Sequence, residues 1–315
     1  MVYLWVDGND TEWQQQKERA LAECGRGLNS QAVAKGRFVE SDELKYSLRS
    51  VEKYAPWIDR IFILTADQKP VWLNEQHPKI RLISHRDFIP SEYLPTFNSS
   101  AIEMSIALIE ELGERFIFAN DDMFFLKAVE PSFFYNAEGV PIARFAHHIS
   151  TKRSLYMDKV RKGQRLVAEI FGKRYDHQPH HNFDAYLKSD VRGCLDHFAE
   201  EAEATRSHRF RTEEEFHRSA WLYYALAQGR AEEKIVDHYS AASNWGERVS
   251  CWLKGQYCTD SKEVGLHRGR LAQRVRRYNP TLLCLNDTER TTDTQREEMR
   301  AFLEGLFPEK SSFEK

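Results

Sequence analysis

Residues 115–122, RFIFANDD, join a buried strand to a cluster of polar residues. The first five residues have the length and apolar composition of a strand covered on both faces, a pattern typical of parallel sheets. Asn120, Asp121 and Asp122 follow at once. In open α/β sheets, ligands bind at the carboxyl ends of the strands. The segment therefore predicts an α/β fold with an acidic pair at its binding edge.

Three more apolar runs of strand length lie upstream, with helical patterns between them. Residues 41–54 repeat apolar side chains at i, i+4 and i+7, the stripe of an amphipathic helix. Ser100 and Glu103 have the spacing of a capping box, which predicts that a further helix opens there. The three predicted strands are residues 1–6, 60–65 and 79–84.

This alternation of strands and helices predicts the domain organisation. We expect residues 1–145 to form a largely parallel, Rossmann-like sheet that is flanked by helices and binds a nucleotide sugar. Residues 146–315 are expected to be mainly helical and to complete the active site. The two halves are predicted to form one intertwined catalytic domain.

The amino-acid composition excludes several classes of protein. Lys and Arg number 45 against 48 Asp and Glu, a net charge of -3, which excludes binding to nucleic acid or membranes through bulk positive charge. No apolar run reaches the roughly 18–20 residues of a membrane span, and the first residues lack a secretory signal. The cysteines at positions 24, 194, 251, 258 and 284 form no CxxC pair, which favours a reducing compartment. We therefore expect a soluble, cytoplasmic protein.

Polar residues also follow the other predicted strands, at Asp7, Asp67 and His85. Strand-to-helix loops are commonly polar, which is the favoured interpretation of Asp67, whereas Asp7 stays open between a polar loop residue and a ligand-binding residue. Asp121 and Asp122 differ, because two adjacent carboxylates repel each other unless a cation lies nearby. Mg²⁺ prefers carboxylate oxygens together with substrate phosphates. The pair therefore predicts a magnesium site, although an acidic dipeptide is also a common loop feature.

Residues 147–211 are rich in His and Arg and contain seven of the 12 histidines. Arg209 and Arg211 stand close to His208. Arg binds phosphate as a planar fork and His exchanges protons, so the segment suits phosphate chemistry; a solvated His-rich surface is the alternative. A second basic stretch, residues 267–277, is interpreted as a helix that is exposed or contacts phosphate or a membrane surface.

Several separated segments match the conserved regions of one known protein family, and they occur in the same order along the chain. They are VYLWVDGNDTEW (2–13), DELKYSLRSVEKYAPWIDRIFILT (42–65), LPTFNSSAIE (94–103), FANDDMFF (118–125), HQPHHNFD (177–184), TRSHRFR (205–211) and CLND (284–287). With these segments the chain resembles the Stealth family. This is the family of bacterial capsular-polysaccharide phosphotransferases and of the catalytic subunit of lysosomal-enzyme N-acetylglucosamine-1-phosphotransferase.

The resemblance implies transfer of a sugar 1-phosphate from a UDP-sugar to a hydroxyl of an acceptor oligo- or polysaccharide. UMP is the leaving group, and the process is capsule or surface-polysaccharide synthesis. The implied cofactor is Mg²⁺ or Mn²⁺, and no nucleic acid is an expected partner. Contact with the inner face of the membrane or with a capsule-assembly complex, and self-association, stay open.

The resemblance also assigns roles to residues of this chain. The catalytic residues are His177, His180, Arg211, Asp121 and Asp122. The nucleotide-sugar-binding residues are Asp7, Gly8, Arg49, Asn98 and Asn120, and the metal ligands are Asp122, Asn286 and Asp287. His177 and His180 compete for one role as base or nucleophile, and Arg49 either contacts a phosphate or braces the sheet.

Two other functions stay open at this point. A UDP-sugar glycosyltransferase would use the same acidic pair and metal, but it would break the anomeric C–O bond and release UDP. A carbohydrate-binding module would use the aromatic residues, 12% of the chain, as stacking platforms for sugars. The module explains neither the acidic pair nor the His/Arg-rich segment.

Overall fold

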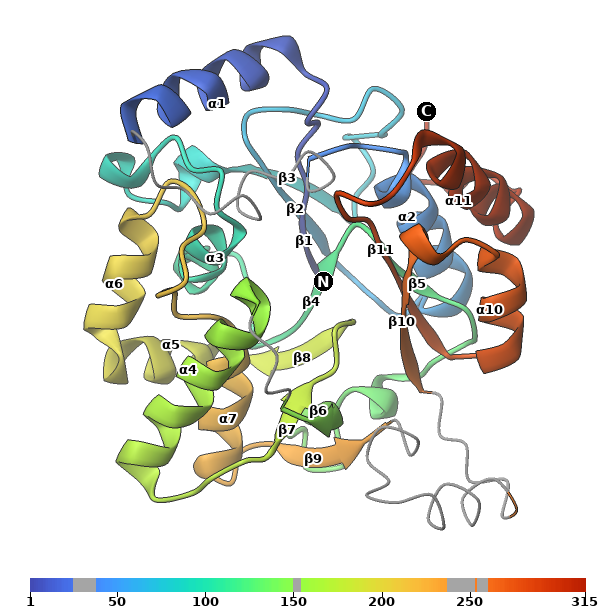
Figure 1. The fold of residues 1–315 in the computed structure, drawn as a ribbon. Coiled ribbons are helices and arrows are strands. Elements are labelled where there is room, and N and C mark those ends of the chain that lie inside the picture. The colour runs from blue at the N-terminus through green and yellow to red at the C-terminus, as the bar shows by residue number, and fades with distance from the viewer. Residues whose placement is uncertain (25–37, 150–153, 237–252, 254–259) are drawn as a thin grey trace.

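The computed structural model of the chain describes residues 1–24, 38–149, 154–236, 253 and 260–315. Its central sheet consists of β1 (Val2–Leu4), β2 (Ile61–Thr65), β3 (Ile80–Ser84), β4 (Arg115–Asn120) and β8 (Asp184–Leu187) (Figure 1). The strand order is β3-β2-β1-β4-β8. All neighbouring strands are parallel except β8, which is antiparallel to β4. The prediction of a largely parallel α/β sheet is confirmed.

Side chains alternate between the two faces of this sheet, and both faces are covered by helices. On one face, Tyr3 packs in a cluster with α2 (Glu43–Tyr54). On the other, Phe118 packs in a cluster with Trp221 of α7 (Ser219–Ala227). Helices α3 (Ser99–Glu103), α4 (Leu155–Phe171), α5 (Lys188–His197) and α6 (Ala199–Ser207) contribute to this second cluster. Burial on both faces explains why the strands are apolar throughout.

Two three-stranded sheets join the halves of the chain. The first has the order β10-β11-β5, formed by β10 (Ser261–Gly265), β11 (Leu282–Asn286) and β5 (Met123–Phe125). The second has the order β7-β6-β9, formed by β7 (His177–Pro179), β6 (Ile142–His148) and β9 (Glu232–Ile235). Because β8 pairs with β4 and β11 pairs with β5, sheet pairing crosses the expected boundary after residue 145. Helices α10 (Leu271–Tyr278) and α11 (Asp293–Leu306) complete the more helical second half, as predicted.

The region around α3 differs from its prediction. Asn98 is the N-cap, and its side chain accepts a hydrogen bond from the backbone N–H of Ser100 at 3.0 Å. Glu103 is the last residue of this short helix and its side chain is buried. The capping-box interpretation is therefore wrong, because asparagine satisfies the free N–H groups of a helix start as well as serine does. Helix α1 (Thr11–Cys24) was not predicted.

Within the described residues, no helix combines the length and the apolar character needed to cross a membrane. Cys24, Cys194 and Cys284 are free thiols, whereas Cys251 and Cys258 lie outside the described residues. The cytoplasmic location, membrane contact and self-association stay predictions.

Candidate active site

A cavity of about 430 Å³ lies at the carboxyl ends of β1, β4 and β11. Asn120, Asp121 and Asp122 line it from the end of β4, and Asn286 and Asp287 line it from the end of β11. The backbone N–H of Leu285 donates to the carbonyl of Asp122 at 2.9 Å, which fixes the two strand ends beside each other. The structure thus brings two distant sequence segments together at the edge where α/β sheets bind ligands.

Burial makes the acidic pair costly to ionise. Desolvation raises the pKa of Asp121 to about 6. Desolvation and the Asp121 charge together raise the pKa of Asp122 well above its ordinary value. Asp122 Oδ1 is buried, with no hydrogen-bond partner in the described residues, and the same Asp121 charge adds to burial in raising the pKa of Glu43. A divalent cation would relieve this concentration of negative charge.

Asp122, His181 and Cys284 offer ligand atoms within 4.8 Å of one another, the one group of this kind found in the described part of the chain. Burial lowers the pKa of His181 and favours the neutral imidazole that binds metals. Burial and nearby carboxylates raise the pKa of the Cys284 thiol, which donates to Asp122 Oδ2 at 3.6 Å. The group fits a divalent cation held mainly by carboxylate oxygen and imidazole nitrogen.

The two residues from β11 already have protein partners. The Asn286 amide donates a hydrogen bond to Glu263. Arg296 donates to Asp287 from Nε to Oδ2 at 2.7 Å and from Nη2 to Oδ1 at 3.3 Å. The predicted metal ligands therefore share one cavity, but Asp287 already has a cationic partner that neutralises it.

A second ionisable group in the cavity centres on Glu103. The side chain is 6% exposed, and its Oε2 has no hydrogen-bond partner among the described residues. His217 Nε2 lies 3.9 Å from Oε2, and Arg218 Nε lies 4.0 Å from Oε1. Burial raises the pKa of Glu103 to about 7, against the opposing charges of Arg218 and Lys159. A carboxyl that titrates near neutral pH is suited to accept a proton.

His217 and Arg218 are fixed by their own contacts. Arg218 forms a buried ion pair with Asp184 of β8. The backbone N–H of Ser219 donates to His217 Nδ1 at 3.1 Å, which leaves Nε2 on the side of Glu103. Burial and the charge of Arg218 hold the pKa of His217 well below its ordinary value. His217 is therefore a neutral imidazole beside a carboxyl.

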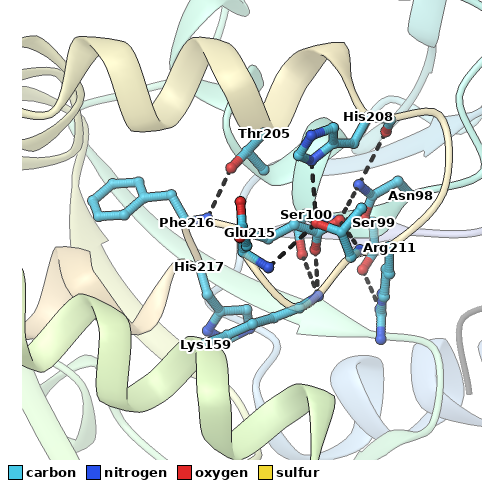
Figure 2. A network of polar contacts seen from close by, with 12 residues as sticks. Asn98, Ser99, Ser100, Lys159, Thr205, His208, Arg211, Glu215, Phe216 and His217 are labelled. Atoms are coloured by element: carbon cyan, nitrogen blue, oxygen red, sulfur yellow. Dashed lines mark hydrogen bonds and ion pairs between the residues drawn. The ribbon is translucent and has the colours of Figure 1, made fainter. Parts of the chain in front are cut away.

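Arg211 is held at the cavity by a polar network (Figure 2). It donates to the hydroxyl of Ser99, while its Nε is buried and finds no hydrogen-bond partner within the described ranges. At the centre of the network, the fully buried Glu215 pairs with Lys159 and accepts a hydrogen bond from Asn98 Nδ2 at 2.5 Å. Nη2 of Arg211 is thus fixed to Ser99, and the guanidinium keeps a further donor, Nε, without a hydrogen-bond partner among the described residues.

Asn98 and Arg49, both predicted to bind a nucleotide sugar, do not line the cavity. Asn98 donates to the carbonyl of His208 at 3.0 Å, and its amide oxygen caps α3. Arg49 forms a bidentate ion pair with Glu314, with both distances 2.8 Å, and donates to the carbonyl of Phe307 at 2.6 Å. These contacts tie α3 to the loop that carries Arg211, and α2 to the C-terminal segment.

Asp7 and Gly8 follow β1 and lie next to the cavity lining rather than in it. Asp7 Oδ1 accepts a hydrogen bond from the backbone N–H of Asn9 at 2.8 Å. A Cβ atom at Gly8 would lie 1.5 Å from the carbonyl oxygen of Phe38, so only glycine permits this approach. Phe38 does line the cavity, and its ring lies 5.3 Å from that of Trp13.

The two predicted catalytic histidines also lie outside this cavity. His177 is on β7, with Nδ1 3.7 Å from a carboxylate oxygen of Glu233. His180 is buried, and its Nδ1 lies 2.8 Å from the hydroxyl of Ser261. Their catalytic roles stay predictions, whereas the described histidines that line the cavity are His85, His181 and His217.

Sequence reasoning missed four site residues: Glu103, His181, His217 and Arg218. Glu103 and His181 stand inside segments that were quoted for other reasons. A usable signal was present at Glu103, because Ala101, Ile102 and Met104 place a carboxylate inside an apolar run. Buried carboxylates of this kind are rare without a partner or a function.

Segments of this chain match models of a known protein family. Three family models match, namely Stealth protein CR1, conserved region 1, over residues 1–23; CR2, conserved region 2, over residues 37–143; and CR4, conserved region 4, over residues 273–315. Together they cover more than half of the chain. The chain belongs to the Stealth family. Residues 177–211 lie outside these matches, so their assignment to a third Stealth region stays a prediction.

Curated Stealth relatives carry phosphotransferase names. An exopolysaccharide phosphotransferase of Nocardia farcinica is 34% identical over 100% of this chain and 60% of its own length. The capsular polysaccharide phosphotransferase WcwK of Streptococcus pneumoniae is 29% identical over 100% of this chain and 98% of its own length. Across five exopolysaccharide phosphotransferases that it matches in full, the chain spans 33% to 60% of their lengths.

A solved structure of the galactosyltransferase LgtC, in complex with donor and acceptor sugar analogs, aligns with 99% of this Stealth chain and 97% of its own chain. The TM-score is 0.46 and the sequence identity is 10%. A likeness at this level says nothing about function.

Proposed function

We propose that this Stealth chain transfers a sugar 1-phosphate from a UDP-sugar to a hydroxyl of an acceptor glycan, forming a phosphodiester and UMP. The names of its relatives suggest capsule or exopolysaccharide synthesis as the process. One observation carries the proposal: the acidic pair, Arg211 and Glu103 line the same cavity. Phosphoryl transfer needs charge neutralisation, a hold on the phosphate and a proton acceptor, and these residues can supply all three.

Mg²⁺ or Mn²⁺ fits the residues around Asp122. Its Oδ1 is buried without a partner, and His181 and Asn286 line the same cavity. When bound, the cation would offset the negative charge of the donor diphosphate. Burial raises the pKa of Asp121, and burial together with the charge of Asp121 raises the pKa of Glu43, so both groups would ionise more readily beside the cation.

The aromatic part of the cavity is the proposed site for the donor nucleoside. Trp5, Trp13, Phe38 and Phe97 line it, and the rings of Trp13 and Phe97 lie 5.3 Å apart. Aromatic faces of this kind offer stacking surfaces to a base. With the nucleoside there, the diphosphate lies toward Arg211 and the acidic pair.

Glu103 is the proposed proton acceptor. The acceptor hydroxyl gives its proton to Glu103, and its oxygen attacks the phosphorus that carries the sugar. A P–O bond forms to the acceptor, and the P–O bond to the bridging oxygen breaks, so that UMP leaves with that oxygen. Arg211 and Arg218 line the cavity and can bind phosphate oxygens through planar guanidinium groups. His217 Nε2 lies 3.9 Å from the Glu103 carboxyl, beyond hydrogen-bond distance.

The released nucleotide tests the proposal. The protein is incubated with Mg²⁺ or Mn²⁺, a panel of UDP-hexoses and an oligosaccharide acceptor, and the nucleotides are separated by chromatography. We expect UMP, a phosphodiester in the product, and loss of both in excess chelator. Release of UDP would instead identify a glycosyltransferase, and full activity in excess chelator would remove the metal from the proposal.

Asp122→Asn is the informative variant in this assay, because it keeps the shape of the side chain and removes its charge. We expect no transfer and an undiminished melting temperature. Asp67→Asn is the matched control, since Asp67 also follows a strand but forms an exposed ion pair with Arg86 outside the cavity. Transfer by the control should match that of the unaltered chain.

A further inference from the structure

A second cavity of about 320 Å³ adjoins the candidate active site. His181, Glu263 and Asn286 line both cavities, so the two meet at this shared wall. The aromatic side chains that suit a nucleoside belong to the first cavity alone. A donor that fills the first cavity from its aromatic part therefore leaves the second open next to the metal ligands proposed above.

The second cavity is the more basic of the two. Lys262, Arg268 and Arg274 line it, and the one carboxylate among its described lining residues, Glu263, lies on the shared wall. Within the described residues, neither arginine forms an ion pair with a carboxylate; Arg274 donates to the carbonyl of Gly265 at 2.8 Å. Desolvation and the charge of Arg268 lower the pKa of Arg274. Two cations that repel each other beside an open cavity are stabilised by an anion.

Two buried polar atoms in this cavity, Gln178 Oε1 and His267 Nδ1, have no hydrogen-bond partner in the part of the chain that the structure describes. The amide oxygen of Gln178 can accept a hydrogen bond from a sugar hydroxyl, and His267 can exchange a hydrogen bond with a hydroxyl or an anion. A ligand with both hydroxyl and anionic groups meets these demands. A flat membrane surface meets them poorly, because these atoms line a recess.

We propose that this second cavity, the anion cavity, binds a phosphodiester group already present in the acceptor glycan while the neighbouring cavity performs transfer. The inference rests on the proposed function, because the proposed reaction places a phosphodiester in its product. An acceptor that has been extended once then carries the group that the anion cavity holds. The cavity would therefore favour repeated chain extension over a single transfer to a neutral glycan.

Binding without turnover tests this inference separately from the proposed reaction. The probes are a synthetic hexose disaccharide joined by a phosphodiester and the same disaccharide with a neutral glycosidic bond, titrated calorimetrically into the full chain. We expect the charged probe to bind at least about tenfold more tightly, with the preference falling as salt rises. Equal affinity for the two probes would overturn the inference. UDP is titrated in parallel, and its binding reports on the donor site alone.

Arg268→Gln and Arg276→Gln form the matched pair. Arg268 lines the anion cavity, whereas Arg276 is exposed on α10 and does not. We expect Arg268→Gln to weaken binding of the charged probe about fivefold, and Arg276→Gln to leave it unchanged. UDP affinity should be the same in both variants. Equal weakening by the two variants would show unspecific attraction and contradict the site.

Vesicles of phosphatidylglycerol complete the test, because their headgroups carry the same phosphodiester chemistry. We expect any vesicle binding to be indifferent to Arg268→Gln. If this variant weakens vesicle binding while the two disaccharides bind alike, the surface serves a membrane and the inference is overturned. If the unaltered chain does not bind UDP, the proposed function is contradicted. The comparison of the two disaccharides still tests the anion cavity in that case.

Discussion

Glu215 and Glu103 are both buried carboxylates near Lys159, but their surroundings differ. Glu215 pairs with Lys159, accepts a hydrogen bond from Asn98 and accepts another from the backbone N–H of Thr212 at 2.9 Å. Glu103 lines the cavity, and no described residue forms a hydrogen bond with its Oε2. A carboxylate with all its partners inside the protein stabilises the fold, whereas one that lacks them costs stability and is available to a substrate.

The largest expected effect is the loss of transfer in Glu103→Gln. The amide keeps the shape of the side chain but cannot accept a proton, so the rate should fall by about 10² to 10⁴. The melting temperature should hold or rise, because the substitution removes a buried ionisable carboxyl whose Oε2 has no hydrogen-bond partner among the described residues. Steady-state rates and thermal unfolding of the same preparations check both. Retained transfer would show that Glu103 is not the proton acceptor.

Glu215→Gln should do the reverse and reduce stability. Removing one partner of a buried ion pair takes away the closest negative charge from Lys159, at a cost of about 3–5 kcal/mol. The double variant Glu215→Gln with Lys159→Met should recover much of this loss, because both charges are then absent. Urea unfolding measures the difference. A double variant as unstable as the single one would contradict the assignment of this pair to the fold.

Arg211→Lys is expected to reduce transfer by about 10- to 100-fold with little change in stability. Lysine keeps the charge but cannot reproduce the planar fork that holds two phosphate oxygens. Arg209→Lys is the control, since Arg209 pairs with Glu23 at the surface. Measuring kcat and KM for the UDP-sugar donor in both variants distinguishes the effect of Arg211→Lys from that of Arg209→Lys. Similar losses in both variants would mean that Arg211 acts only through general charge.

The smallest effect is a pH dependence from Glu103. Because burial raises its pKa to about 7, transfer should fall about tenfold per pH unit below this value. The free energy of unfolding changes with pH in the opposite direction to the transfer rate. The folded carboxyl keeps its proton up to about pH 7, whereas the unfolded one releases it near 4.5. Its contribution to stability is therefore complete below about pH 4.5 and is lost as the pH rises through about 7.

Glu103→Gln provides the control for the pH dependence, since both slopes should be absent from it. Rates and urea unfolding at several pH values between 5 and 9 measure them. A transfer rate in the unaltered chain that rises as the pH falls would contradict a carboxylate base.

The strands could be predicted from the sequence because burial on both faces leaves a local signal. Ile61–Thr65 and Arg115–Asn120 are apolar over their whole length, apart from their ends. The location of Asp121 and Asp122 follows from the end of one such strand. Asn286 and Asp287 were placed by a family resemblance, and the pairing of β11 with β5 explains why they meet the acidic pair.

The Glu103 side of the site left a weaker signal in the sequence. Glu103 and Arg218 are more than a hundred residues apart and meet only through the packing of α3 and α7 regions on the central sheet. Adjacent histidines posed a similar problem, because the path of the chain after β7 decides that His181, and not His180, lines the first cavity. Such choices depend on tertiary contacts, which no local pattern encodes.

The central claim is that the cavity breaks a P–O bond of the donor and leaves the anomeric C–O bond intact. A UDP-hexose labelled with ¹⁸O at the anomeric oxygen tests this directly by mass spectrometry of the products. We predict unlabelled UMP and a phosphodiester product that retains the label. Label recovered in released UDP would show cleavage of the anomeric C–O bond and contradict the account.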